Sequence, residues 1–287
     1  MTAREIPVTR ACGLLGISRR WLCYQSRKRD EDLSERLMEL ARRYPRYGYR
    51  RLHQMLLREQ ARRGQAVPIN VKRVRRLCVA LGLKLASRKR RKRRGIGFGL
   101  PVRAQHVNHV WAYDFVFDCC ENGRQLKILT VVDEFTREAL AVNVEYRMGA
   151  KGVCEVLTKA MALRGCPEYV RSDNGPEFIA KALMKLLKTR RIGCRHIEPG
   201  SPWQNGRNER FNGTLRDEGT SMETFYHRDQ AQAVCELFRR QYNTQRPHSS
   251  LAYQTPEEFA WRHSAAPAPA SAAPRPAPPP RNAAVLT

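Results

Sequence analysis

The chain has 287 residues, enough for one substantial core and one or two small helical modules if about 100 to 200 residues make a domain. Its formal net charge is +26, and the first 100 residues carry 28 Lys and Arg against only 7 Asp and Glu. No apolar stretch approaches the roughly 20 residues of a membrane-spanning helix, and no basic helix has a large aromatic face, so this charge favours DNA over a membrane as its partner.

Residues 1–30 have the pattern of a helix-turn-helix. Helices are expected on both sides of the Gly16-Ile17 turn, the first over residues 9–15 and the second after Ser18, whose side chain suits an N-cap. The second helix begins with the candidate DNA-binding residues Arg19 and Arg20, because basic side chains at a helix start suit contact with phosphate or the major groove. The alternative is a pair of amphipathic helices in a structural bundle.

Residues 31–87 predict a second helical module that also binds DNA. Its helices are expected over 33–44, 49–60 and 71–81, with Asn70 as N-cap of the last and Gly82 as its stop. One face of that last helix is apolar and should pack, namely Val71, Val74, Leu77, Cys78 and Leu81. The basic residues off this face are candidates for phosphate contact: Lys72, Arg73, Arg75 and Arg76.

Residues 88–104 read as a basic flexible linker. Self-repulsion and the glycines at 95, 97 and 99 oppose regular structure here. Tracking of DNA phosphates is the expected role of its seven consecutive cations, Arg88, Lys89, Arg90, Arg91, Lys92, Arg93 and Arg94. A solvated tether, or a nuclear signal in another host, is the alternative. The tail at 264–287 is almost entirely Ala, Pro and Ser, and we expect it to be disordered.

Residues 105–263 predict an α/β core with a mixed sheet and C-terminal helices. Strand patterns lie at 110–117, 125–132 and 138–145, and are followed by a helix at 150–164 and a strand at 168–172. A helix at 177–190 and a short strand at 193–197 complete the order.

Three carboxylates in this core form the candidate catalytic site. Asp114 lies inside an apolar strand pattern, where a buried carboxylate is costly unless a cation compensates it. Asp173 follows the strand at 168–172. Glu209 follows Asp173 after 35 intervening residues, on a helix that Ser201 can cap and Pro202 can begin. On that helix Asn205, Glu209, Asn212 and Arg216 should share a polar face, with Phe211 and Leu215 packing inward. Glu209 should therefore face the end of the sheet without bringing polar neighbours into the core.

This pattern resembles the DDE core of retroviral-type integrases, and the surrounding motifs resemble the OrfB transposase of the IS3 family of insertion sequences. The resemblance spans roughly residues 5–260 through ordered segments at 44–52, 131–137, 172–178, 198–206, 209–218 and 242–248. It implies a ribonuclease H-like sheet, the triad Asp114, Asp173 and Glu209 as catalytic residues and metal ligands, a homo-oligomeric assembly and an OrfA partner or fusion.

Three clustered carboxylates remain ionised together only beside hard cations, and ligation by oxygen alone suits Mg²⁺, with Mn²⁺ as a substitute. Two such ions would clamp the attacking and leaving oxygens of a phosphodiester displacement. Other acids fit the pattern less well: Asp118, Asp133 (the reserve candidate), Glu177, Asp217 and Glu218. Near Glu209, Gln204 and Asn205 are further candidate contacts to DNA.

The histidines and cysteines do not predict a metal site. His106 and His109 lack paired cysteines, so the zinc module of retroviral integrases is not expected, and His248 reads as structural. The nine cysteines have no zinc spacing and suggest buried thiols in a reducing compartment. With no secretory pattern at the N-terminus, a cytoplasmic, nucleoid-associated protein is expected.

The prediction is therefore a transposase or integrase that cleaves element ends and transfers 3′-hydroxyl strands in double-stranded DNA. The alternatives are a non-catalytic DNA-binding regulator or remnant, and a ribonuclease H-type nuclease that uses the same acids.

Overall fold

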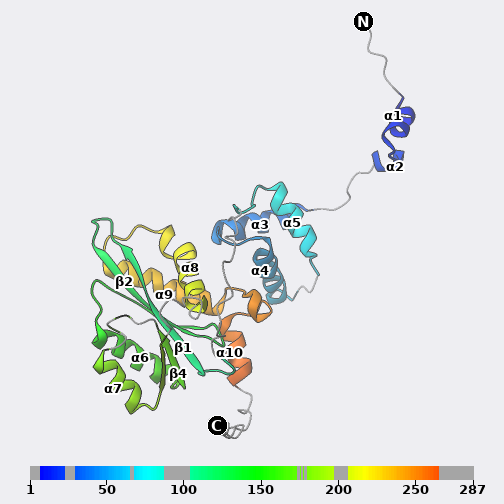
Figure 1. The fold of residues 1–287 in the computed structure, drawn as a ribbon. Helices are drawn as coiled ribbons and strands as arrows, with labels where there is room; N and C mark the ends of the chain where they lie inside the picture. Colours follow the sequence, from blue (N-terminus) through cyan, green and yellow to red (C-terminus); the bar gives the residue numbers. More distant parts are fainter. Residues whose placement is uncertain are drawn as a thin grey trace, which may run out of the picture. The chain divides into compact units, whose positions relative to one another are not determined.

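The computed structural model describes residues 7–22, 30–64, 68–86, 104–172, 175, 177, 180–196 and 206–264, and the chain divides into two compact units, 1–87 and 88–287 (Figure 1). Several predicted features lie outside the described residues, namely the basic run 88–94, most of the Ala/Pro tail, Asp173, the expected helix start at Ser201 and Pro202, and the candidate DNA contacts Gln204 and Asn205.

The first unit begins with the predicted pair of short helices, α1 (Val8–Leu15) and α2 (Arg19–Leu22). Gly16 separates them in the left-handed region at φ 64°, a conformation that costs glycine little. The backbone N–H of Trp21 donates to Ser18 Oγ at 3.1 Å, which confirms Ser18 as the cap. Arg19 and Arg20 are exposed.

Three longer helices follow in this unit, α3 (Glu31–Arg43), α4 (Tyr49–Arg62) and α5 (Val71–Ala80). They bury a shared core that includes Leu37, Leu52, Leu56 and Val74. Asn70 Oδ1 accepts from the N–H of Lys72 at 2.8 Å, so the predicted cap is confirmed. The prediction that Val71 packs inward is wrong: it is 39% exposed, because it opens the helix one turn before the packed residues.

A five-stranded mixed sheet forms the centre of the second unit, in the order β3-β2-β1-β4-β5. Its strands are β1 (Val110–Cys119), β2 (Gln125–Asp133), β3 (Ala139–Glu145), β4 (Tyr169–Ser172) and β5 (Gly193–His196). β1 pairs antiparallel with β2 and parallel with β4, so the predicted α/β class and mixed sheet are confirmed.

Helices cover both faces of the sheet (Figure 1). On one face, α6 (Ala150–Arg164) and α7 (Lys181–Thr189) bury a core with Trp111, Tyr113 and Leu129. The helix predicted to start at 177 begins only at Lys181, since Glu177 lies in a turn and its carboxylate pairs with Lys127 of β2.

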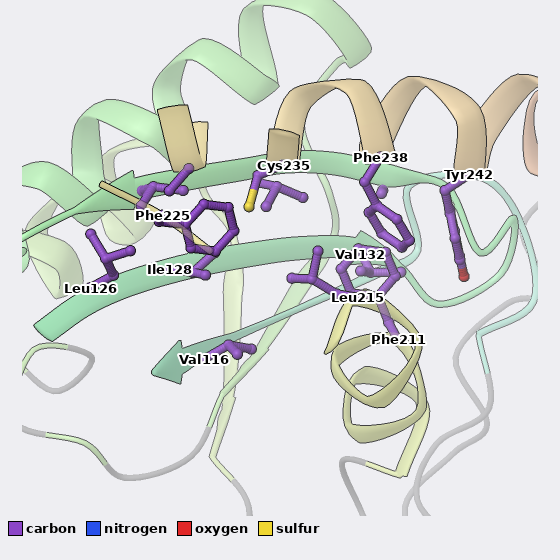
Figure 2. Close-up of a cluster of buried hydrophobic side chains, with 14 of the residues drawn as sticks. Val116, Leu126, Ile128, Val132, Phe211, Leu215, Phe225, Cys235, Phe238 and Tyr242 are labelled. Carbon is purple, nitrogen blue, oxygen red and sulfur yellow. The ribbon is translucent and has the colours of Figure 1, made fainter. Parts of the chain in front are cut away.

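The opposite face carries α8 (Gly206–Glu218) and α9 (Arg228–Thr244), which pack against Val116, Ile128 and Val132. Figure 2 shows Phe211 and Leu215 of α8 and Phe238 and Tyr242 of α9 in one apolar cluster with Val116, Ile128 and Val132. The short helices η2 (Thr220–Met222) and η3 (Ser249–Leu251), and then α10 (Pro256–Ser264), complete the described chain. No described helix is both long and apolar enough to cross a membrane.

The cysteines are only partly as expected. Cys12, Cys78, Cys120 and Cys235 are buried, and burial raises the pKa of the Cys235 thiol to about 12, which keeps it protonated and unreactive. Cys119 and Cys166 are exposed, so the expectation of uniformly buried thiols is wrong for these two.

Candidate active site

Asp114 lies in the middle of β1 and is directly opposite Thr130 of β2. Successive side chains of a strand alternate between faces, so Asp114 lies on the same side of the sheet as Val116, which packs with α8 and α9. The carboxylate is half-buried, and its Oδ1 accepts from the N–H of Phe115 at 2.8 Å. The central strand thus holds an acid at the interface with α8.

Asn212 of α8 connects that helix to Asp114. Its Nδ2 donates to Asp114 Oδ2 at 3.0 Å, and its Oδ1 accepts from the Thr130 hydroxyl at 2.9 Å. The expectation that no polar neighbour of Glu209 enters the core is therefore wrong for Asn212: it is 7% exposed, because strand partners satisfy its amide and make its burial acceptable. Glu209 precedes Asn212 by one turn on α8 and is exposed.

Asp173, the third acid, lies outside the described residues, as do Gln204, Asn205 and the basic run 88–94. What the structure describes is the residue before it. Ser172 is fully buried and ends β4, the parallel neighbour of β1.

Asp133, the reserve candidate, has a structural role at the end of β2. Its carboxylate accepts three backbone N–H groups, from Asn108 at 2.8 Å, Phe135 at 2.7 Å and Thr136 at 3.0 Å. Burial raises the pKa of this carboxyl group, although these hydrogen bonds oppose the shift. Its lone pairs organise the turn between β2 and β3, which makes it a poor metal ligand.

Three of the other acids near the triad have hydrogen-bond or ion-pair partners. Glu177 pairs with Lys127, Glu218 forms a two-bond ion pair with Arg246, and Asp118 Oδ1 accepts from the N–H of Cys119 at 2.8 Å. These contacts account for Glu177 and Glu218 as elements of the scaffold.

A buried ion pair that sequence reasoning missed lies beside the site. Glu134, 1% exposed, accepts from Arg171 Nη1 at 2.6 Å, and Arg171 itself is 5% exposed. Arg207 donates to the backbone carbonyl of Glu134, and its Nε lies 4.0 Å from the Glu134 carboxylate. Arg171 precedes Asp173 by two residues and Arg207 precedes Glu209 by two. This two-residue spacing of both arginines from the acids was the only sequence signal for their contacts with Glu134.

In the helical unit, the basic residues predicted to meet DNA have different environments. Arg73 Nε donates to Asp30 Oδ1 at 2.6 Å and Arg76 Nη2 to Asp30 Oδ2 at 3.0 Å. Burial raises the pKa of Asp30, but these two guanidinium groups outweigh that effect and hold the pKa below its usual value. Lys72 and Arg75 are exposed, and the Arg75 guanidinium lies 6.0 Å from the centre of the Tyr49 ring.

His106 and His109, which were not expected to form a metal site, lie together in the structure with Glu168. Their rings stack at 4.7 Å, and His106 Nε2 lies 3.2 Å from Glu168. The backbone N–H of Gln105 donates to His109 Nδ1 at 3.0 Å, so the neutral ring carries its proton on Nε2, the atom that faces Glu168. In this tautomer Nε2 has no lone pair to offer a metal.

Known protein families match the helical part and the sheet-containing part of the chain separately. Two family models described as "Integrase core domain" match residues 104–202 and 190–256, and one described as "HTH-like domain" matches 28–92. A protein of insertion element IS407 from Burkholderia multivorans is 42% identical over 93% of this chain and 95% of its own length. The transposase InsD of insertion element IS2 from Escherichia coli is 30% identical over 80% of this chain and 78% of its own length.

The chain belongs to the IS3-type family of insertion-element transposases. The family expected from the sequence is thereby confirmed. A chain in the cryo-EM structure of a simian T-cell lymphotropic virus intasome, in complex with PP2A regulatory subunit B56 gamma, has the same fold at a TM-score of 0.50. It is 21% identical, over 76% of this transposase and 73% of the viral chain. The ribonuclease H-like, integrase-type core is confirmed as well.

Proposed function

We propose that this transposase cleaves the ends of its element and joins the resulting 3′-hydroxyl strands to target DNA. The hydrogen bond from Asn212 to Asp114 carries this proposal, because it fixes the helix of Glu209 onto the strand of the first acid. In this proposal Asp173, which follows the buried end of β4 beside β1, completes the triad.

The described acids suit a hard divalent cation. Both oxygens of Asp114 accept hydrogen bonds from neutral N–H donors, which orient the carboxylate. The donors at the site are oxygens, the ligands that Mg²⁺ prefers, with Mn²⁺ as a substitute. A pair of Mg²⁺ ions, when bound, would activate the attacking hydroxyl and stabilise the leaving oxygen.

The chain's own residues orient the reaction. Asp114 and Glu209 supply negative charge from two different elements, and Asn212 keeps those elements in register. We further propose double-stranded DNA, both element ends and target, as the substrate. Exposed Arg19, Arg20, Lys72 and Arg75 would supply phosphate contacts, together with the run 88–94 and with Gln204 and Asn205. A homo-oligomer, with an OrfA partner or fusion for end recognition, is the proposed working form.

The test is cleavage and strand transfer with Mg²⁺ on a duplex that carries the terminal repeat of the element. Wild type is compared alone and as a fusion to OrfA, which shows whether the fusion is needed for activity. In the active form, Asp114→Asn, Asp173→Asn and Glu209→Gln should each lose both steps while binding DNA normally. Asp118→Asn is the matched control, because Asp118 lies on β1, four residues after Asp114, and should retain activity. Strand transfer by any triad variant would refute the role of that residue; DNA binding without chemistry in every form would favour the regulator.

A further inference from the structure

A small cavity beside the N-terminal part of α8 gathers positive charge. Its volume is about 230 Å³, below the roughly 300–1,000 Å³ of pockets that take drug-sized ligands. The charged or polar side chains that line it come from the β2–β3 turn, α8 and the region of η3: Arg137, Arg207, Arg210, His248 and Ser250. Val132, Phe211 and Tyr242 supply an apolar floor. A small anion is the ligand whose size and charge suit this lining.

Arg137 is the most informative residue of the cavity. Its side chain is half-buried, and within the described ranges no acid forms an ion pair with it. Burial lowers the pKa of this guanidinium to about 10, and the nearby charges of Arg207 and Arg210 add to the shift. The group is therefore still charged at neutral pH, in surroundings that penalise its charge.

The backbone at Arg137 is also unfavourable. Its φ is 66°, in the left-handed region that few residues with a long side chain adopt, and glycine would adopt it at lower cost. The turn nevertheless carries an arginine there. Strain and uncompensated charge at one residue are the features expected where a side chain is kept for binding.

The nearest acid does not neutralise the cavity. Glu134 is bound to Arg171 and contacts Arg207, so a single carboxylate serves a cluster that also includes Arg137 and Arg210. The arginine fork matches the oxygens of phosphate, and three such groups around one small space are an arrangement that binds phosphate. Arg207 and Arg210 also flank Glu209 in sequence, which places the cavity next to the proposed catalytic helix segment.

We propose that this cavity binds one backbone phosphate of the DNA substrate, with Arg137 as its principal ligand. The identification of DNA as the source of the phosphate rests on the proposed function. The bound phosphodiester would neutralise Arg137 and hold the strand beside Glu209. The carboxylates of an acidic protein segment are the competing ligand, and the experiment below separates the two.

The first arm measures anion binding without any chemistry. Thermal unfolding of the full chain is followed in inorganic phosphate and in chloride at equal ionic strength. Wild type should unfold at a higher temperature in phosphate, and Arg137→Gln should lose that difference. In chloride Arg137→Gln should unfold at the same or a higher temperature than wild type, because it removes an uncompensated charge. Arg190→Gln, an exposed arginine at the end of α7, is the matched control and should respond like wild type.

The second arm measures DNA binding against salt concentration. Loss of one phosphate contact should flatten the slope of log affinity against log salt by about 0.9 in Arg137→Gln, and Arg190→Gln should keep the wild-type slope. If Arg137→Gln folds poorly, exposed Arg210→Gln replaces it in both arms. An unchanged phosphate response in these variants would overturn the cavity as an anion site. A lost phosphate response with an unchanged DNA slope would overturn DNA as its ligand.

The two proposals can fail separately. A phosphate response that depends on Arg137, in a protein that neither cleaves nor joins DNA, would sustain the anion site and reject the catalytic function. Strand transfer by a protein with no such response would do the reverse.

Discussion

The side-chain amide of Asn212 donates a hydrogen bond from Nδ2 to Asp114 Oδ2 at 3.0 Å. Asn212 lies one helical turn after Glu209. The Oδ1 of the same amide accepts a hydrogen bond from the hydroxyl of Thr130, which lies opposite Asp114 on the neighbouring strand. One buried amide thus links both central strands to the helix of the second acid. The distance between the two acids therefore depends on how firmly Asn212 holds α8 to the sheet.

Asn212→Ala should raise the Mg²⁺ concentration needed for half-maximal strand transfer, since Glu209 is no longer held relative to Asp114. The free energy of unfolding should fall by about 1–3 kcal/mol, because buried partners lose a hydrogen bond. Metal titration and urea unfolding measure the two effects. Thr214→Ala is the control, because its hydroxyl bonds only within α8, to the carbonyl of Arg210. A lower stability with an unchanged metal requirement would reduce Asn212 to a packing residue.

Glu134→Gln should impair strand transfer even when the folded fraction matches wild type. Glu134 contacts Arg171 and Arg207, and each of these arginines precedes one of the acids, Asp173 or Glu209, by two residues. Breaking a buried pair leaves a charge uncompensated and should cost about 3–5 kcal/mol. Glu138→Gln is the control: it removes a carboxylate from the same turn, but its partner Arg164 is half-exposed and stays solvated. Equal loss of activity in both variants, measured at matched folding, would contradict a positioning role for Glu134.

Periodicity was sufficient to predict the elements that carry the site. The apolar run around Asp114 predicts a strand, and the caps Ser18 and Asn70 can be predicted because an N-cap depends only on the next few residues. Phe211 and Leu215 were correctly expected to pack inward for the same local reason.

Contacts between distant residues could not be predicted in this way. Asn212 was assigned to the polar face because a helical wheel contains no information on Thr130, which lies 82 residues earlier. Arg73 and Arg76 looked available for DNA because their common partner Asp30 precedes them by more than 40 residues. In each case a polar residue is explained by a partner that only the tertiary fold supplies.

Lys127→Met should reduce both activity and stability at neutral pH, because Lys127 pairs with Glu177, four residues after Asp173. The hydrogen bond from Lys127 lowers the pKa of Glu177 in the folded state. Its contribution to stability is therefore complete above the unfolded pKa, near ~4.3, and is lost as the pH falls through the lower folded value. Unfolding measured from pH 7 to pH 3 should show this loss in wild type and a flatter profile in the variant. Identical profiles would mean that the pair contributes nothing to stability.

Arg75→Gln should weaken DNA binding more than Arg73→Gln, because Arg75 is exposed whereas Arg73 is bound to Asp30. If Arg75 contacts one phosphate, its loss should flatten the salt dependence by about 0.9, with a similar effect on all DNA sequences. Arg73→Gln should keep the wild-type salt slope and should lower stability by about 1 kcal/mol or less, as expected for a partly exposed ion pair. Fluorescence anisotropy on the full chain across a salt series measures the slope. A steeper loss for Arg73 than for Arg75 would show that the pair with Asp30 opens on binding, so that Arg73 meets phosphate after all.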